Sequence, residues 1–494
     1  MKIRFKNRFP RFAEELKRLS HWEDLAEVKP PIPSRRLLLF ISAVVLDILL
    51  VRGLFLYSDW QQEAIYMSGI FVLAALLWIT EALPLFATAI LIIALEIILL
   101  ANPGNWAGLG FEGGYSPDYR EFLAPLSNPV IVLFFGGFIL AHAVLKEGVD
   151  KAMASGILRA FGGKPIFVML GLMLITAFFS MWMSNTATTA MMITLVYPIL
   201  KQIPDKDPLR KGLLLCIPFA ANIGGMGTPI ASPPNAVAVS FLQQSGFSIS
   251  FLEWVLIATP LMLFLLLFAW LFLYNNFKPS DSNLYLKPEA RKIDTRGWYV
   301  ILIMVLTVLL WLTDRWHGLS TAVVALFPAI AFTATGLLSR SDVNSLEWHI
   351  LILIMGGIAL GVGMQLSGLD EIFVTFLPSE GKMVLSAMVL ATLLFSTFIS
   401  NTAAANLLLP IGISFAMQPE GAEAGSPVQL AISIALAASL AMALPISTPP
   451  NTIAYSKGDL LSSDFTKAGL VIGALAIMLI IALGGTIISF WTSY

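Results

Sequence analysis

Cysteine, histidine and charged residues are scarce in this sequence of 494 residues. Its one cysteine, Cys216, excludes an intrachain disulfide, and with only four histidines a thiolate or Cys/His metal site is not expected. Charged residues make up 12% of the chain, and none occurs in residues 165–200, 212–252, 383–419 or 424–456. A proton relay through those segments is not expected, because such relays use membrane carboxylates or histidines. No catalytic residue is expected either, since no charged pair, H-E-x-x-H motif or Ser/His arrangement falls there.

Apolar residues are abundant instead, at 57% of the chain with a mean hydropathy of +0.82. This composition predicts an all-α polytopic membrane protein, because about 20 apolar residues cross the hydrocarbon core as a helix. Eleven stretches have this character, near residues 37–57, 63–80, 84–102, 129–145, 212–241, 252–276, 297–313, 319–338, 349–367, 428–455 and 466–491. Two further stretches, 166–200 and 383–417, are each interpretable as one long span or as a re-entrant hairpin of two half-helices.

The distribution of basic residues favours the hairpins. With the amino terminus in the cytoplasm and both stretches re-entrant, 26 of the 30 Lys and Arg residues fall inside, and only Arg120, Arg315 and Lys382 fall outside. The inside segments are then 1–36, 146–165, 201–211, 277–296, 338–348 and 456–467. Full crossing by 166–200 would move the basic residues of 201–211 outside and invert the later loops. We therefore predict about 11 transmembrane helices plus two re-entrant hairpins, with the carboxyl terminus outside.

Two motifs recur at equal spacing. Ser184-Asn185-Thr186 is repeated as Ser400-Asn401-Thr402, and each copy precedes a Pro-Pro-Asn box, at Ser232-Pro233-Pro234-Asn235 and Thr448-Pro449-Pro450-Asn451, by 48 residues. Such recurrence indicates an internal duplication. With the predicted topology, the second copy enters the membrane from the opposite side, so the two halves form an inverted repeat. Hydrophobic segments interrupted at corresponding points of two halves are typical of a transporter's binding site.

The motif residue types suit an anion and a cation together. Ser, Asn and Thr cap helices, so each tripeptide can end one half-helix and begin the next. The following half-helix presents free N–H groups and about half a positive charge, which attract small anions. Side-chain oxygens and freed carbonyls suit Na⁺. Two helix ends supply roughly one positive charge, whereas a dicarboxylate carries about two negative charges. At least one Na⁺, and we expect two, should therefore bind with the anion; no organic cofactor is expected.

At this point the residues resemble a known family, the divalent anion/sodium symporters of di- and tricarboxylates and sulfate. The similarity covers almost the whole chain after residue 36 and includes Trp78-Ile79-Thr80-Glu81-Ala82-Leu83-Pro84, which looks like that family's Trp-x-Thr-Glu-Ala-x-Pro element. Met442 and Ala454 depart from the family's usual Phe and Val near the second box. The resemblance implies a homodimer in the cell inner membrane, with a static scaffold and a mobile transport domain that moves as an elevator.

Carried over residue by residue, the resemblance also implies site residues. Substrate carboxylates would meet Ser184, Asn185, Thr186, Ser232, Pro233, Ser400, Asn401, Thr402, Thr448 and Pro449. One Na⁺ site would use Ser180, Ser184 and Asn185 with backbone near Gly227 and Ala231. The other would use Ser396, Ser400 and Asn401 with backbone near Ile399 and Ser447. Ser180 and Ser396 each precede their tripeptide by one helical turn, so each hydroxyl can face the same ion as the tripeptide.

These expectations divide the chain into six segments. They are a cytoplasmic basic amphipathic segment (1–36), a first scaffold segment (37–164), the first half of the transport domain (165–276), a cytoplasmic linker (277–296), a second scaffold segment (297–381) and the second half of the transport domain (382–494). The expected function is secondary active transport of a C4–C6 di- or tricarboxylate, such as succinate, malate, fumarate, 2-oxoglutarate or citrate, coupled to Na⁺. A dicarboxylate exchanger, a sulfate or other inorganic anion transporter, and an anion channel on the same framework remain as alternatives. No nucleic-acid partner is expected.

Overall fold

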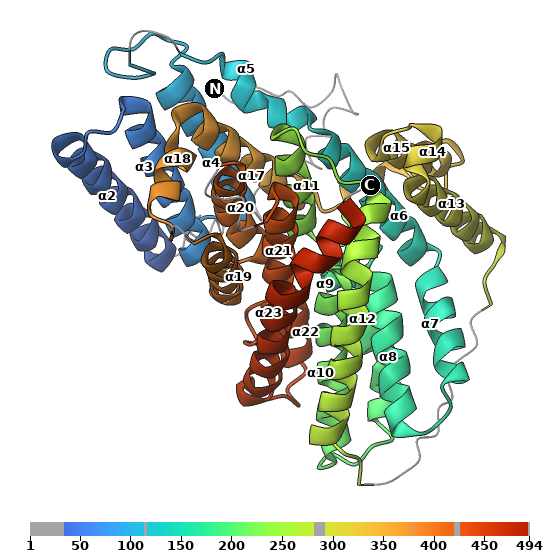
Figure 1. Cartoon of the computed structure of the whole chain (residues 1–494). Coiled ribbons are helices and arrows are strands. Elements are labelled where there is room, and N and C mark those ends of the chain that lie inside the picture. Colours follow the sequence, from blue (N-terminus) through green and yellow to red (C-terminus); the bar gives the residue numbers. More distant parts are fainter. Residues whose placement is uncertain (1–33, 113–115, 281–291, 379, 419–424, 493–494) are drawn as a thin grey trace, which may run out of the picture.

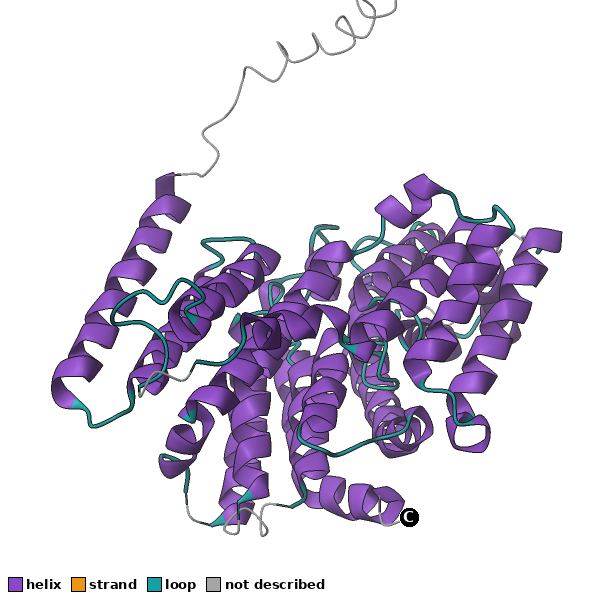
Figure 2. Cartoon of the chain, turned by 90° about the horizontal axis from the view of Figure 1, so that it is seen from above, coloured by secondary structure: helices purple, strands orange, loops and turns teal. Residues whose placement is uncertain are grey.

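Every regular element of the described chain is a helix. The computed structural model describes residues 34–112, 116–280, 292–378, 380–418 and 425–492. Figures 1 and 2 show helices joined mostly by short loops. The predicted all-α class is therefore confirmed, whereas the amphipathic segment expected before residue 34 lies outside the described residues.

The predicted first scaffold segment holds the helices α2 to α7. They are α2 (Ser34–Tyr57), α3 (Gln62–Thr80), α4 (Leu85–Glu96) with a π-helical continuation (Ile97–Ala101), α5 (Tyr119–Leu123) with a 3-10 turn (Ala124–Ser127), α6 (Pro129–Lys146) and α7 (Val149–Ala160). Within the Trp78–Pro84 element, Glu81 adopts a left-handed conformation at the end of α3. Its side chain is exposed, as suits a residue that shapes the turn.

The predicted second scaffold segment contains α13 (Thr295–Leu312), α14 (Asp314–His317), α15 (Thr321–Ala334), α16 (Arg340–Asn344), α17 (Trp348–Ser367) and α18 (Leu369–Thr375). Helices α6 and α15 approach closely at Gly136, and α4 and α17 approach closely at Gly356, where a side chain would collide with Ala325 and Ala89 respectively. Close helix packing is what small residues allow in membranes.

The two hairpin-bearing segments are interrupted where the motifs lie. The first contains α8 (Pro165–Ser180), α9 (Asn185–Leu200), α10 (Pro208–Gly224), α11 (Pro233–Gln244) and α12 (Phe251–Asn276). The second contains α19 (Gly381–Phe398), α20 (Asn401–Met417), α21 (Pro427–Ser439), α22 (Pro449–Tyr455) and α23 (Ser462–Thr492). In the described chain, seven helices reach spanning length by themselves, and the hairpin helices are shorter. The number of spans predicted from the sequence therefore includes broken and short helices.

Each predicted hairpin folds back on itself at its tripeptide. In hairpin 1, α8 runs alongside α10 in the same direction, because Met169 lies beside Gly212 and Ala177 beside Gly224. Helix α9 returns to the first turn of α10, where Arg210 donates a hydrogen bond to the Leu200 carbonyl at 2.9 Å. In hairpin 2, the side chains of Met388 on α19 and Ile434 on α21 both approach Gly412 on α20.

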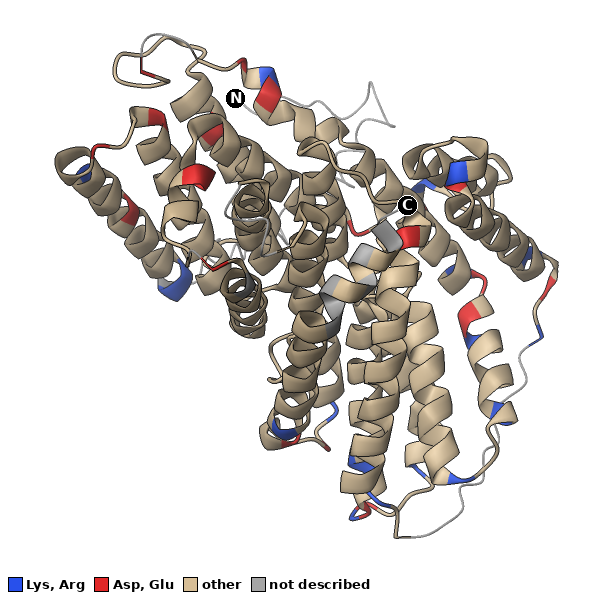
Figure 3. Ribbon diagram, in the orientation of Figure 1, with Lys and Arg blue, Asp and Glu red and all other residues tan. Residues whose placement is uncertain are grey.

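Three segments predicted for one side of the membrane converge in space. Arg210 pairs with Asp459 at 3.2 Å, and Lys211 pairs with Asp464 at 2.9 Å. The Ser280 amide donates to Asp207 at 3.0 Å, which brings the start of the predicted linker to the same end. Figure 3 shows charged residues gathered at these lower helix ends. In Figure 1, α8, α10 and α12 extend well below the ends of α3 and α17.

Candidate functional site

The tip of hairpin 1 is the turn 181–184, between α8 and α9. Ser184 is the N-cap of α9, and its hydroxyl accepts a hydrogen bond from the Ala187 amide at 3.3 Å. Helix α9 therefore begins at the tripeptide, as predicted, and its first N–H groups face the tip. The side chains of Ser184, Asn185 and Thr186 are partly exposed at this tip.

The tip of hairpin 2 repeats this geometry. Ser400 is the N-cap of α20, and its hydroxyl accepts from the Ala403 amide at 3.2 Å. Ile399 is extended and buried between α19 and α20. Thr402 is buried, whereas Ser400 and Asn401 are partly exposed. Both tripeptides thus cap a helix with their serine and leave the serine and asparagine side chains partly exposed.

A cluster of three oxygens lies behind each tripeptide. The Ser180 hydroxyl contacts Asn185 Oδ1 and the Ala221 carbonyl, the latter at 2.8 Å. The Ser396 hydroxyl contacts Asn401 Oδ1 and the Ala438 carbonyl, each at 2.8 Å. A serine hydroxyl has one hydrogen and can donate it to only one of two acceptors. With Oδ1 of each asparagine facing the hydroxyl, each cluster has one more oxygen contact than its hydrogen can satisfy, and a small cation would stabilise that orientation of the amide.

Gly225 gives the first cluster its room. A Cβ at this position would lie 2.5 Å from Asn185 Nδ2 and 2.6 Å from Asn185 Oδ1. Only a residue without a side chain allows the Asn185 amide to approach the backbone that follows α10 this closely. The turn is also tied to the hairpin, because the Thr228 hydroxyl donates to the Met181 carbonyl at 2.5 Å. In the second half, the Ser447 hydroxyl donates to the Thr397 carbonyl at 2.8 Å.

The Pro-Pro-Asn boxes begin new helices after the breaks. Pro233 and Pro449 are the first residues of α11 and α22, a position where the missing N–H costs nothing. The Asn235 amide donates to the Gly225 and Thr228 carbonyls at 2.9 and 2.8 Å. The Asn451 amide likewise donates to the Met442 and Leu444 carbonyls at 3.0 and 2.9 Å. The asparagines of the boxes therefore hold the unwound loops, which the sequence did not indicate.

Each box is joined to the opposite half of the chain, the second box by two contacts and the first by one. The Asn222 amide donates to Thr448 Oγ1 at 3.1 Å and to Asn451 Oδ1 at 3.3 Å. In return, the hydroxyls of Ser232 and Ser439 lie 3.2 Å apart. Asn222 and Ser439 are fully buried and were missed by sequence reasoning. The constant offset between the repeated motifs could have pointed to them, since Asn222 and Ser439 stand at nearly corresponding positions of the two halves.

The remaining predicted residues lie around these contacts. Gly227 and Ala231 are in the buried turn between α10 and α11. Pro233 is partly buried and Pro449 is exposed. The structure thus brings the predicted residues of each half onto a hairpin tip and an adjoining unwound loop, and it links the two halves through the boxes.

One carboxylate reaches the first tripeptide from outside the hairpins. Ser184 donates a hydrogen bond to Glu347 Oε1 at 3.3 Å, and Glu347 directly precedes α17. In the described part of the chain, Glu347 is the one ionisable side chain that hydrogen-bonds to either tripeptide. Burial raises the pKa of its carboxyl, while the charge of His349 and the hydrogen bond from Ser184 act to lower it. Sequence reasoning missed Glu347, because 163 residues separate it from Ser184.

An all-helical membrane fold with paired broken helices, oxygen-rich tips and little charge defines a membrane transport protein. The family described as "Sodium:sulfate symporter transmembrane region" matches residues 36–493. The chain belongs to this family, which confirms the resemblance found in the motifs. It is accordingly a multi-pass membrane transport protein and not an enzyme.

Three curated relatives illustrate the range of the family. An "Uncharacterized transporter" of Haemophilus influenzae is 33% identical over 466 residues, which are 89% of this chain and 95% of that protein. The "Sodium-dependent dicarboxylate transporter SdcS" of Staphylococcus saprophyticus is 30% identical, over 89% of this chain and 90% of that protein. The "Inorganic phosphate transporter PHO87" of Saccharomyces cerevisiae is 30% identical over 83% of this chain. The chain spans about half the length of this and other yeast relatives.

A solved structure supports the fold. The crystal structure of the Alcanivorax borkumensis YdaH transporter aligns with a TM-score of 0.56 and 14% identity, over 84% of this chain and 98% of that one. Because the identity is low, the likeness concerns the arrangement of helices alone.

Proposed function

We propose that the protein is a secondary active transporter of a small divalent anion, foremost a C4–C6 di- or tricarboxylate, coupled to Na⁺. The observation that carries this proposal is the pair of oxygen clusters behind Asn185 and Asn401. Each has more oxygen contacts than its serine hydrogen can satisfy, and each adjoins the first turn of a helix whose capping serine is partly exposed. A cation in the cluster and an anion at the helix end would stabilise one another.

We further propose that Na⁺ binds in both clusters. In the first, Ser180 and Asn185 would be ligands together with the Ala221 carbonyl, and in the second Ser396 and Asn401 with the Ala438 carbonyl. Ser184 and Ser400 would contribute to the ions and, with Thr186 and Thr402, meet the substrate. Ser232, Pro233, Thr448 and Pro449 would border the anion from the boxes, and Gly227, Ala231, Ile399 and Ser447 would border the cations. Na⁺ is a hard cation that prefers such oxygen ligands, and these sites need no ionised side chain.

The architecture that we propose is an inverted repeat with elevator motion. The repeat is supported by equivalent contacts in both halves. They are the hydroxyl-to-amide contacts behind the tripeptides, the hydrogen bonds of the box asparagines to loop carbonyls, and the contact of each box with the opposite half. The elevator is supported by α8, α10 and α12 of the first transport half, which extend below the ends of the scaffold helices α3 and α17 in Figure 1. We place the end that carries Arg210 and Asp459 in the cytoplasm, and we propose a homodimer on the family resemblance.

Labelled succinate in proteoliposomes tests the function. Uptake driven by an inward Na⁺ gradient alone supports symport, whereas uptake that requires internal dicarboxylate supports the exchanger. Uptake that persists unchanged when choline replaces Na⁺ would contradict the coupling. Conductance without a fixed Na⁺-to-anion ratio would indicate a channel instead.

A second candidate, transport of an inorganic anion, is favoured by one finding. Relatives of similar identity include the phosphate transporter PHO87, and the family description names sulfate. Helix ends and hydroxyls bind phosphate and sulfate as readily as carboxylates. Competition of labelled succinate uptake by unlabelled sulfate or phosphate distinguishes the candidates, because the anion that competes at the lower concentration is the preferred substrate.

A further inference from the structure

The tip of hairpin 1 touches the predicted scaffold through one polar contact and an apolar wall. The polar contact is the hydrogen bond from Ser184 to Glu347. Glu347 occupies the N-cap position of α17, yet its carboxylate does not cap that helix. Instead, the carboxylate accepts a hydrogen bond from Ser184, a residue of the proposed substrate site on the hairpin.

Glu347 is held firmly on the scaffold side. The preceding helix, α16, is tied to α6 because Lys146 donates to Asp342 at 2.6 Å. The following residue, Trp348, donates its indole hydrogen to the Val343 carbonyl at 3.0 Å. These contacts fix the backbone on both sides of Glu347. Its hydrogen bond with Ser184 therefore connects the predicted scaffold with hairpin 1.

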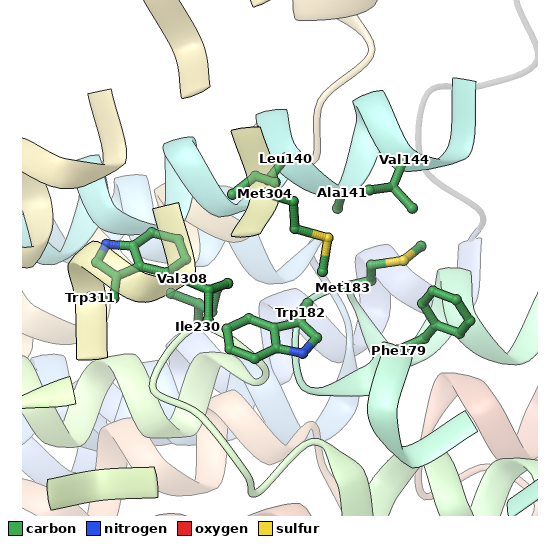
Figure 4. A pocket seen from close by; sticks show the side chains of 10 residues that line it. All are labelled: Leu140, Ala141, Val144, Phe179, Trp182, Met183, Ile230, Met304, Val308 and Trp311. Atoms are coloured by element: carbon green, nitrogen blue, oxygen red, sulfur yellow. The ribbon is translucent and has the colours of Figure 1, made fainter. Parts of the chain in front are cut away.

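The apolar wall lies at Trp182 and Met183, which directly precede Ser184 in the tip. Figure 4 shows Trp182 and Met183 of the tip opposite side chains of α6 and α13, with Ile230 beside them. The cavity between them has a volume of only about 10 Å³. Its scaffold lining consists of Leu140, Ala141, Val144, Met304, Val308 and Trp311. Apolar contact is not directional, so the wall by itself fixes no particular height of the tip along the scaffold.

We propose that Glu347 is an internal competitor of the transported anion. It holds Ser184 and hairpin 1 against the scaffold when no anion is bound, and the arriving anion displaces it. The inference rests on the proposed anion site at Ser184. A substrate carboxylate and the Glu347 carboxylate need the same hydroxyl hydrogen, and that hydroxyl has only one. Their negative charges also repel, so both cannot occupy the tip together at low cost.

The first test is Glu347→Gln in the full-length protein, measured by labelled succinate uptake at saturating Na⁺. Glutamine keeps the size and hydrogen-bonding ability of the side chain but removes the charge. The KM for succinate should fall about three- to tenfold, since the charged hydrogen bond of a half-buried carboxylate is replaced by a weaker neutral one and competes less. The matched control is Glu371→Gln, an exposed scaffold carboxylate on α18, which should leave the KM unchanged.

The charge of the anion separates displacement from simple repulsion. Displacing the Glu347 carboxylate from Ser184 costs the same free energy whichever anion takes the hydroxyl hydrogen. The KM for succinate and the inhibition constant for monomethyl succinate, which carries one negative charge, should therefore fall by the same factor. Repulsion alone would be about half as large for the monoanion, so its constant would fall by only about the square root of the fall for succinate. No fall, or a fall for monomethyl succinate that is only the square root of that for succinate, would overturn the proposal.

The second test measures the contact without any ligand. Spin labels at Ala190→Cys on α9 and Asn344→Cys on α16 report the distance between hairpin and scaffold, and the native Cys216 is fully buried and shielded from labelling. Without substrate, the Glu347→Gln variant should show a broader distance distribution than the unsubstituted protein. Adding succinate to the unsubstituted protein should also broaden its distribution. An identical distribution in both proteins would refute the contact as a latch.

The two tests also separate the failure of the latch from the failure of the transport proposal. If the unsubstituted protein takes up neither succinate nor sulfate nor phosphate, the proposed function is wrong. The ligand-free distances still decide whether Glu347 holds the hairpin. If uptake is normal and Glu347→Gln changes neither KM nor distances, the function stands and the role of Glu347 falls.

Discussion

Removing the hydroxyl at the centre of an oxygen cluster tests the cation sites most directly. Ser396→Ala deletes an oxygen that lies 2.8 Å from both Asn401 Oδ1 and the Ala438 carbonyl. Ser180→Ala deletes its counterpart in the first half. We expect each variant to fold and to need a higher Na⁺ concentration for half-maximal uptake.

The size of the effect follows from the role of the hydroxyl. A neutral structural hydrogen bond contributes about 1 kcal/mol to folding and would leave Na⁺ dependence unaltered. A contact with a charged group contributes about 1.5–3 kcal/mol, and about 1.4 kcal/mol corresponds to a factor of ten. If Ser396 is a ligand, the half-saturating Na⁺ concentration should therefore rise about ten- to a hundredfold.

Matched controls lie one helical turn earlier. Thr176 and Thr392 are fully buried, and each donates at 2.6 Å to a carbonyl of its own helix, at Leu172 and Met388. Thr176→Val and Thr392→Val remove a buried hydroxyl without touching a cluster. Uptake of labelled succinate against Na⁺ concentration compares all four variants, with thermal unfolding in detergent as the check on folding. Unchanged Na⁺ half-saturation in both serine variants would refute the cation sites.

Three further predictions concern neighbouring features. Asn185→Ala and Asn401→Ala should each abolish transport with unchanged thermal unfolding and particle size, because each removes an oxygen shared by cation and substrate; wild-type uptake by both would contradict the assigned sites. Gly225→Ala should also abolish uptake, because the new Cβ would lie 2.5 Å from the Asn185 amide, whereas Gly156→Ala meets nothing within 4 Å and should remain active. Asp342→Asn should flatten the dependence of thermal stability on acid: Lys146 and Ser339 lower the pKa of Asp342, so its stabilisation is present above its ordinary value of 3.8 and is lost as the pH falls below it. An equally steep loss in the variant would show that the ion pair is not its source.

Breaks in helices were predictable because they have local causes. Proline lacks an N–H, so each box had to begin a helix, and α11 and α22 do begin at Pro233 and Pro449. Ser and Asn at a tripeptide are strong caps, so α9 begins directly after Ser184. Apolar length alone placed α12 within a residue of its observed bounds, Phe251–Asn276.

Contacts between distant segments could not be predicted in the same way. The sequence contains the 216-residue recurrence but not the exchange by which Asn222 bonds to the box of the other half. The count of Lys and Arg residues places Glu347 at the end of a loop, because that count indicates on which side of the membrane a loop lies. It does not indicate how deep in the membrane a residue lies. Hydropathy places Val149–Ala160 in a loop, because this segment is too short and polar to cross a membrane. Such a segment can still form an amphipathic helix, as α7 does.

Two pairs of consecutive residues lie where the halves of the chain meet. Ala221 gives its carbonyl to the Ser180 cluster, and its neighbour Asn222 holds Thr448 of the other half. Ala438 gives its carbonyl to the Ser396 cluster, and its neighbour Ser439 holds Ser232. One peptide unit therefore separates each oxygen cluster from a contact with the box of the opposite half. If Na⁺ binds in the clusters as we propose, drawing in the Ala221 or Ala438 carbonyl would also shift the neighbouring residue that holds the opposite box, so each half would respond to the loading of the other.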